Sequence, residues 1–116
     1  MRDPAERLRD ILVAIDQIEE YSDRGQSAYE QDKLIQSWFI RHLQIIGEAA
    51  RALPEDIRAR APSIPWRDVI GMRHVLVHQY FGVDLAVLWE IVANDLPRIK
   101  PEIEALLHSL EQSTPT

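Results

Sequence analysis

The chain has 116 residues, of which 46% are apolar and only four are glycine, a composition that fits one compact domain and does not indicate a disordered chain. It contains no cysteine, which excludes disulfides, thiol nucleophiles and thiolate metal sites and is compatible with a reducing cytosol. The net charge of −6 argues against a broad basic surface that coats nucleic acid.

Two helices are expected in the first half of the chain. Asp3 followed by Pro4 is typical of a helix start, and Gly25 is expected to end this helix. A longer helix is predicted from about Ser27 to Leu53, where Pro54 stops it. In both segments apolar residues recur at helical spacing: Leu8, Ile11, Leu12, Ile15 and Ile18, then Leu34, Ile35, Trp38, Phe39, Ile45, Ile46, Ala49 and Leu53.

The next part of the chain is expected to contain a short helix at residues 55–60 and a turn at residues 62–65. A further helix is predicted from Trp66 to residue 80 or 81, where Gly82 interrupts it. No stretch alternates between apolar and polar residues for long enough to indicate a strand. This part of the chain is therefore also predicted to be helical.

The last helix is expected to begin after Asp84, whose side chain is a suitable N-cap. Pro97 and Pro101 should kink or split it, because proline lacks the N–H that an interior helical position donates. The predicted architecture is an all-α, up-and-down bundle of four to five helices in one domain over residues 1–112, with a flexible tail at 113–116. Neither a membrane span nor a secretory signal is recognisable, so a cytoplasmic location is expected.

Arg73 lies, by helical projection, in the middle of an apolar stripe on the helix that begins at Trp66. A guanidinium is costly to bury without a partner. Two interpretations are therefore open: a structural ion pair with a carboxylate on another helix, for which Glu48 is one candidate, or a charge held in a crevice to bind a phosphate. The stripe comprises Trp66, Val69, Ile70, Leu76, Val77 and Tyr80.

His78 lies about 140° round this helix from Arg73, on a side that it shares with Arg67, Gly71 and His74. Gly71 leaves room there for a molecule to approach. His78 is either a surface histidine favoured by the helix dipole or a catalytic imidazole. His74 and His78 are four residues apart and could share a metal ion, but no third ligand is evident, so neither a metal site nor a cofactor is predicted.

Two more residues carry open interpretations. His42 falls on the apolar side of its helix and is expected to be a core histidine with a satisfied ring. Tyr80 returns to the stripe of Arg73, where it either packs or presents its hydroxyl beside the arginine. Because one ideal helix does not aim Arg73 and His78 at the same atom, joint action requires a distorted helix or a second copy related by a two-fold axis.

Residues 64–84 resemble the signature segment of the HepT-like proteins, a branch of the HEPN superfamily, and read IPWRDVIGMRHVLVHQYFGVD. The core of that signature is an arginine, four residues, a histidine, one residue and a tyrosine, which here are Arg73, His78 and Tyr80. Residues 45–53, IIGEAARAL, are similar to that family's second helix. The resemblance covers nearly the whole chain.

The resemblance implies a homodimeric helical bundle that brings two motifs into one cleft and cuts RNA without a metal ion, as the toxin of a bacterial type VII-like toxin–antitoxin system. Arg73 would stabilise charge on the phosphate and His78 would act as general base or acid. A minimal nucleotidyltransferase antitoxin of the MntA type would neutralise the toxin by AMPylation of Tyr80.

This chain departs from the family pattern at one position, because His74 stands where many members have Asn or Asp after the motif arginine. His74 and Arg67 are therefore supporting candidates only. A non-catalytic helical module that docks a nucleotidyltransferase is the alternative, which the net charge of −6 leaves open.

Overall fold

The computed structural model describes residues 3–78 and 84–112, although the side chains of residues 74–78 lie outside that description. All regular structure in these ranges is helical, which confirms the predicted all-α class. The elements are α1 (Pro4–Ser22), α2 (Gln26–Gln31), α3 (Lys33–Ala52), α4 (Glu55–Arg58), α5 (Trp66–His78), α6 (Leu85–Glu90), the π-helical turn η1 (Ile91–Asp95) and α7 (Leu96–Gln112).

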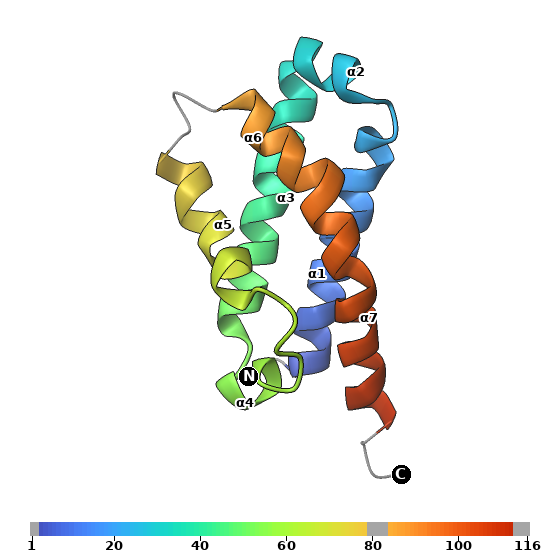
Figure 1. Cartoon of the computed structure of the whole chain (residues 1–116), viewed down its shortest axis with the longest axis vertical. Helices are drawn as coiled ribbons and strands as arrows, with labels where there is room; N and C mark the ends of the chain where they lie inside the picture. Colours follow the sequence, from blue (N-terminus) through green and yellow to red (C-terminus); the bar gives the residue numbers. More distant parts are fainter. Residues whose placement is uncertain (1–2, 79–83, 113–116) are drawn as a thin grey trace.

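The long helices run up and down along an elongated bundle of 49 × 26 × 24 Å (Figure 1). α1 packs against α3 and α7, while α5 packs on the flank of α3. The interior between these helices is filled by aliphatic and aromatic side chains: Leu8, Ile11, Ile15, Ile18, Tyr29, Phe39, Leu43, Ile46, Ile64, Leu88, Leu96 and Ile103. Among the described residues, no helix is both long and apolar enough to cross a lipid bilayer.

Aspartate side chains begin three of the helices. Asp3 accepts a hydrogen bond from the backbone N–H of Ala5, and Asp84 accepts one from Ala86, so both predicted N-caps are confirmed. The turn at residues 62–65 and the start of α5 at Trp66 are also confirmed. The expected end of that helix at residue 80 or 81 lies outside the described residues.

The prediction of one helix from Ser27 to Leu53 was wrong, because the chain breaks at Asp32 into α2 and α3. Asp32 has an extended backbone, and its side chain accepts hydrogen bonds from the N–H groups of Leu34 and Ile35. The aspartate therefore caps a new helix instead of continuing the old one. Leu34, a member of the predicted apolar series, is 81% exposed as a result of this geometry at the helix start.

The prolines near the C-terminus do not split the last helix, which was one of the two outcomes expected of them. The chain stays helical from Leu85 to Gln112, with Pro101 inside α7. The irregularity lies earlier, in η1, where Leu96 donates to the carbonyl of Ile91 five residues back, immediately before Pro97. A π turn redirects backbone hydrogen bonds at the point where proline offers no donor, so the helix absorbs the defect without a break.

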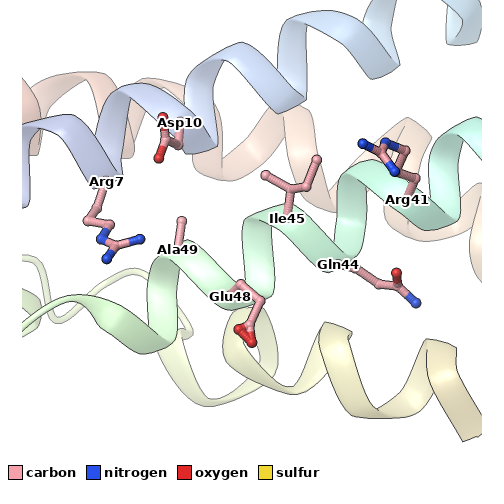
Figure 2. A pocket seen from close by; sticks show the side chains of 7 residues that line it. All are labelled: Arg7, Asp10, Arg41, Gln44, Ile45, Glu48 and Ala49. Atoms are coloured by element: carbon pink, nitrogen blue, oxygen red, sulfur yellow. The ribbon is translucent and has the colours of Figure 1, made fainter. Parts of the chain in front are cut away.

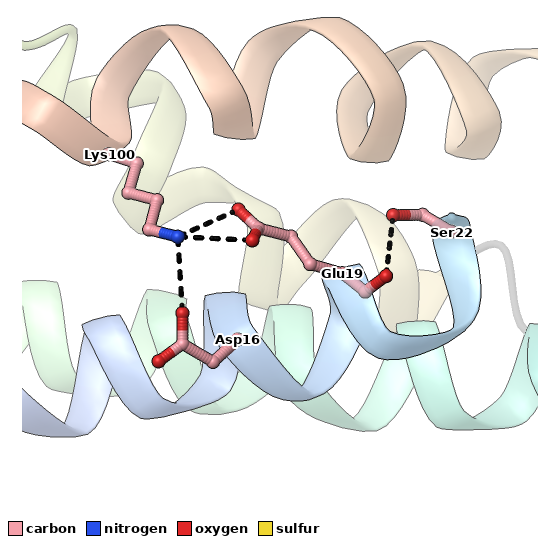
Figure 3. Close-up of polar contacts among 4 residues, drawn as sticks. All are labelled: Asp16, Glu19, Ser22 and Lys100. Atoms are coloured by element: carbon pink, nitrogen blue, oxygen red, sulfur yellow. Dashed lines mark hydrogen bonds and ion pairs between the residues drawn. The ribbon is translucent and has the colours of Figure 1, made fainter.

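An ion-pair cluster joins α7 to α1 (Figure 3). Nζ of Lys100 lies 3.0 Å from Oε2 of Glu19 and 3.2 Å from Oδ1 of Asp16. The hydrogen bond to Glu19 raises the pKa of Lys100 above its ordinary value. Because the lysine side chain is only 28% exposed, this cluster aligns α7 on α1 more firmly than a freely solvated pair would.

Tyr29 joins α2, α3 and α6 at one end of the bundle. Its ring stacks against Phe39 and Trp89, with centroid distances of 5.5 and 5.3 Å. Its hydroxyl donates a 2.8 Å hydrogen bond to the backbone oxygen of Leu85, at the first residue of α6. Tyr29 therefore holds the start of α6, the element that follows the motif segment in the chain.

Replacing Tyr29 by Phe is expected to lower the free energy of unfolding by about 1–2 kcal/mol at neutral pH, because the Leu85 carbonyl loses its donor. The difference from wild type should shrink above pH 10. Burial, followed by the charges of Glu30 and Asp84, raises the pKa of Tyr29 from 10.0 to about 12. The unfolded chain therefore loses this proton first, and the contribution of the group to stability is lost as the pH rises from 10 towards 12.

Urea denaturation of both proteins at pH 7 and at pH 11, followed by circular dichroism, measures this difference. The same loss of stability between the two pH values in wild type and in the Tyr29→Phe variant would contradict the assignment.

Candidate functional site

The crossing of α3 and α5 depends on a glycine. A Cβ atom added to Gly47 would lie 2.9 Å from the backbone nitrogen of Arg73 and 3.2 Å from the backbone oxygen of Ile70. Side chains do not tolerate such distances from backbone atoms, so only glycine allows α5 to approach α3 this closely. The position of Arg73 is therefore set by backbone contact between two helices.

Trp66 anchors the other end of α5. Its indole N–H donates to the backbone oxygens of Arg58 and Ala61, each at 3.0 Å. These carbonyls belong to the end of α4 and the following loop, so the indole ties that loop to the first turn of α5. Gly47 and Trp66 together fix the direction in which α5 carries its remaining side chains.

Arg73 forms an ion pair with Glu48 on α3. Its Nε lies 2.8 Å from Oε1 of Glu48, and Nη1 of Arg51 lies 4.0 Å from the same oxygen. Glu48 is thus the carboxylate partner that the sequence offered as a candidate. The terminal nitrogens of Arg73 have no ion pair or hydrogen bond with any residue that the structure describes. Within the described part of the chain, the ion pair thus holds the guanidinium through Nε alone.

Arg73 does not stand in the middle of a buried stripe as predicted, because its side chain is 35% exposed. Among the side chains of α5 that the structure describes, the buried ones are Val69 and Met72, which are 1% and 8% exposed. The projection could not place this face, since it depends on where α3 and the α6–α7 segment contact α5. The shift brings Arg73 to the edge of the interface, where a solvent-borne anion can reach it.

The other predicted site residues are placed less fully. Arg67 is exposed on the first turn of α5. A Cβ atom at Gly71 would meet no described atom within 4 Å, which agrees with the open space predicted there. His74 and His78 belong to α5, but their side chains lie outside the description, and Tyr80 lies outside the described residues altogether. Their approach to Arg73 therefore stays a prediction.

His42 is confirmed as a core histidine. It is 7% exposed, its Nδ1 lies 2.8 Å from the backbone oxygen of Trp38, and its ring centroid lies 4.3 Å from that indole. Among the described residues, no three His, Cys, Asp or Glu side chains are grouped so that they could hold a metal ion.

A groove between α1 and α3 was missed in the sequence. Its volume is about 350 Å³, and Figure 2 shows side chains of both helices around it. The sequence did contain one signal: Arg41, Ile45 and Ala49 are each four positions apart and so share one face of α3. The groove is lined by Arg7, Asp10, Arg41, Gln44, Ile45, Glu48 and Ala49. Since Glu48 also holds Arg73, the groove adjoins the candidate site.

Comparison with known proteins finds one family and several relatives that are named as ribonucleases. Residues 11–106 match the family described as Ribonuclease HepT-like. The chain is 44% identical over 102 residues to the "Probable ribonuclease HepT" of Thermococcus cleftensis, covering 85% of this chain and 91% of that protein. It is 40% identical to two proteins of Methanocaldococcus jannaschii named as candidate RNases, MJ1380 and MJ0125. These alignments cover 89% and 96% of this chain and 95% and 97% of the relatives. No solved structure matches the chain significantly.

Proposed function

The chain belongs to the Ribonuclease HepT-like family, and from this premise we propose that it is a metal-independent endoribonuclease. We assign it as the toxin of a type VII-like toxin–antitoxin system. The observation that carries the proposal is the ion pair of Arg73, which Glu48 holds through Nε while the terminal nitrogens contact no residue that the structure describes. A guanidinium presented in this way matches the two oxygens of a phosphodiester, which it can bind through two parallel N–H groups.

The proposed reaction uses the nucleophile that RNA itself carries. The 2′-hydroxyl loses its proton to an imidazole that acts as the base, and its oxygen attacks the adjacent phosphorus. The bond from phosphorus to the 5′-oxygen then breaks, and that oxygen takes a proton from a second group that acts as the acid. His78 fills the role of general base or acid, because imidazole titrates near neutral pH. Arg73 stabilises the extra negative charge on the five-coordinate phosphorus. The products are a 2′,3′-cyclic phosphate and a free 5′-hydroxyl.

The active unit in this proposal is a homodimer. On a straight helix Arg73 and His78 diverge, so one copy does not aim both groups at the same phosphate. Two copies about a two-fold axis place two arginines and two histidines around one cleft. Arg67 and His74 are the supporting residues on the open side of α5, and His74 takes the polar role that Asn or Asp has in many relatives.

Purified protein tests the reaction directly. It should cut single-stranded RNA in the presence of EDTA and leave DNA of the same sequence intact, because DNA lacks the 2′-hydroxyl. End-group analysis of the RNA fragments should find cyclic phosphates. Cleavage of DNA, or inhibition by EDTA, would contradict the mechanism. A folded chain that binds a nucleotidyltransferase but cuts no RNA would favour the non-catalytic docking module instead.

Control by the antitoxin is proposed to act through Tyr80. Co-expression with a minimal nucleotidyltransferase of the MntA type should add whole AMP units to the intact mass of the protein and suppress its toxicity. Adenylate is bulky and negative, so beside Arg73 it would exclude the RNA phosphate both sterically and electrostatically. The Tyr80→Phe variant lacks the acceptor oxygen and should keep its unmodified mass and its toxicity under co-expression. An AMP-modified Tyr80→Phe protein would refute the assignment.

A further inference from the structure

The groove between α1 and α3 is continuous with the candidate site through one side chain. Glu48 lines the groove, and its Oε1 lies 2.8 Å from Nε of Arg73 on α5. In Figure 2, Arg7 and Asp10 extend from α1 towards α3, while Arg41 stands at the other end of the groove on α3. A linear ligand at Arg73 can therefore continue into the groove.

Charge around the groove is positive although the whole chain is acidic. Arg7 and Arg41 make no ion pair with any carboxylate that the structure describes. The charge of Glu48 is met by Arg73 and more distantly by Arg51. Two arginines and two carboxylates line the groove, and the two arginines that contact Glu48 raise the count in and beside it to four against two, in a protein of net charge −6. Such a local excess attracts a polyanion to this place and not to the remaining surface.

The space between the two lining arginines suits a nucleotide. Ile45 is 37% exposed on the α3 side of the groove, which gives a small apolar surface for a ribose or a base, while Ala49 beside it is buried. Gln44 adds an amide that can donate and accept hydrogen bonds. A volume of about 350 Å³ falls in the range typical of small-molecule sites.

We propose that this groove is a subsite for the RNA strand next to the cleaved bond, with Arg7 and Arg41 binding successive flanking phosphates. The inference rests on the proposed ribonuclease function and adds where the substrate lies. RNA is the occupant because the groove offers two guanidinium groups that pair with no described carboxylate, beside a short apolar surface, and this arrangement complements a strand of phosphates and riboses. A second copy of this chain would not bring a continuous strand of phosphates to the groove.

The test uses the Arg7→Ala/Arg41→Ala double variant of the full chain. Binding of a labelled single-stranded RNA of mixed sequence is measured by anisotropy over a range of salt concentrations, in a His78→Ala background that prevents cleavage. Each lost phosphate contact should reduce the slope of log K against log salt by about 0.7, so the double variant should lose roughly 1.4. In the active background, KM for RNA should rise about tenfold, with the loss lying in KM and not in kcat.

The matched control is Arg24→Ala/Arg98→Ala, which also removes two positive charges, but at exposed positions outside the groove. Its salt slope and KM should equal those of wild type. An unchanged slope for the groove variant beside normal cleavage would overturn the subsite and leave the ribonuclease function standing. Wild-type protein that neither binds nor cuts RNA would overturn both. Dissociation of a dimer by the groove variant alone, seen by analytical ultracentrifugation, would show that copies of the chain meet there and would also overturn the subsite.

Discussion

The Arg73→Ala variant is expected to cut RNA about 10²–10³-fold more slowly than wild type while the bundle stays folded. The proposed reaction places extra negative charge on the phosphate oxygens, and Arg73 is the permanent cation of the motif. The ion pair with Glu48 joins side chains that are 35% and 47% exposed, so its loss should cost at most about 1 kcal/mol of stability. The Arg73→Ala variant should therefore lose most of its activity and little of its stability.

Single-turnover cleavage of a labelled RNA measures the rate, and thermal unfolding by circular dichroism measures the fold. Arg73→Lys keeps the charge but loses the planar fork, so its rate should fall between those of wild type and Arg73→Ala. His78→Ala should lose a factor of about 10²–10⁴, because general acid–base catalysis is removed. Arg98→Ala, on α7, is the charge-matched control and should cut at the wild-type rate. Wild-type rates in both motif variants would refute the catalytic assignment.

The Gly47→Ala variant is expected to lower the free energy of unfolding by about 1–3 kcal/mol and to reduce RNA cleavage. The added methyl group would lie 2.9 Å from the backbone nitrogen of Arg73, and backbone atoms cannot move aside without displacing α5. Because α5 carries the motif, the displacement moves Arg73 relative to Glu48. The effect on activity should therefore exceed what the loss of stability alone explains at a temperature where the variant is fully folded.

Gly71→Ala provides the matched control within the same structure. Both glycines are helical, so alanine gains up to about 1 kcal/mol of helix propensity at either position. A methyl group at Gly71 meets nothing within 4 Å, so this variant should be as stable as wild type or more stable. Chemical denaturation of both variants gives the two values, and their difference isolates the contact between α3 and α5. Equal stabilities would show that this contact is not tight.

The predictions that held depend on neighbouring residues. Asp3 and Asp84 begin their helices because an aspartate can bond the N–H groups that follow it in the chain. His42 was placed in the core by its position in a helical repeat of apolar residues. Asp32 had the same capping chemistry, but the surrounding apolar spacing favoured an unbroken helix. Two local signals competed there, and the cap prevailed.

The motif of Arg73, His78 and Tyr80, and with it the family, was determined by the sequence alone, because both are patterns of residue identity and spacing along the chain. Only the tertiary structure decided how Arg73 is presented. Its exposure depends on the contact of α5 with Gly47, a residue of another helix, which no projection of α5 contains.

The groove between α1 and α3, like the exposure of Arg73, was decided by the packing of helices. Arg7 and Arg41 belong to different helices and line the same groove only when α1 packs against α3. Helix periodicity is a short-range property that the sequence displays directly. The distance between side chains on two helices depends on how closely their backbones approach, and that is set by packing across the whole bundle.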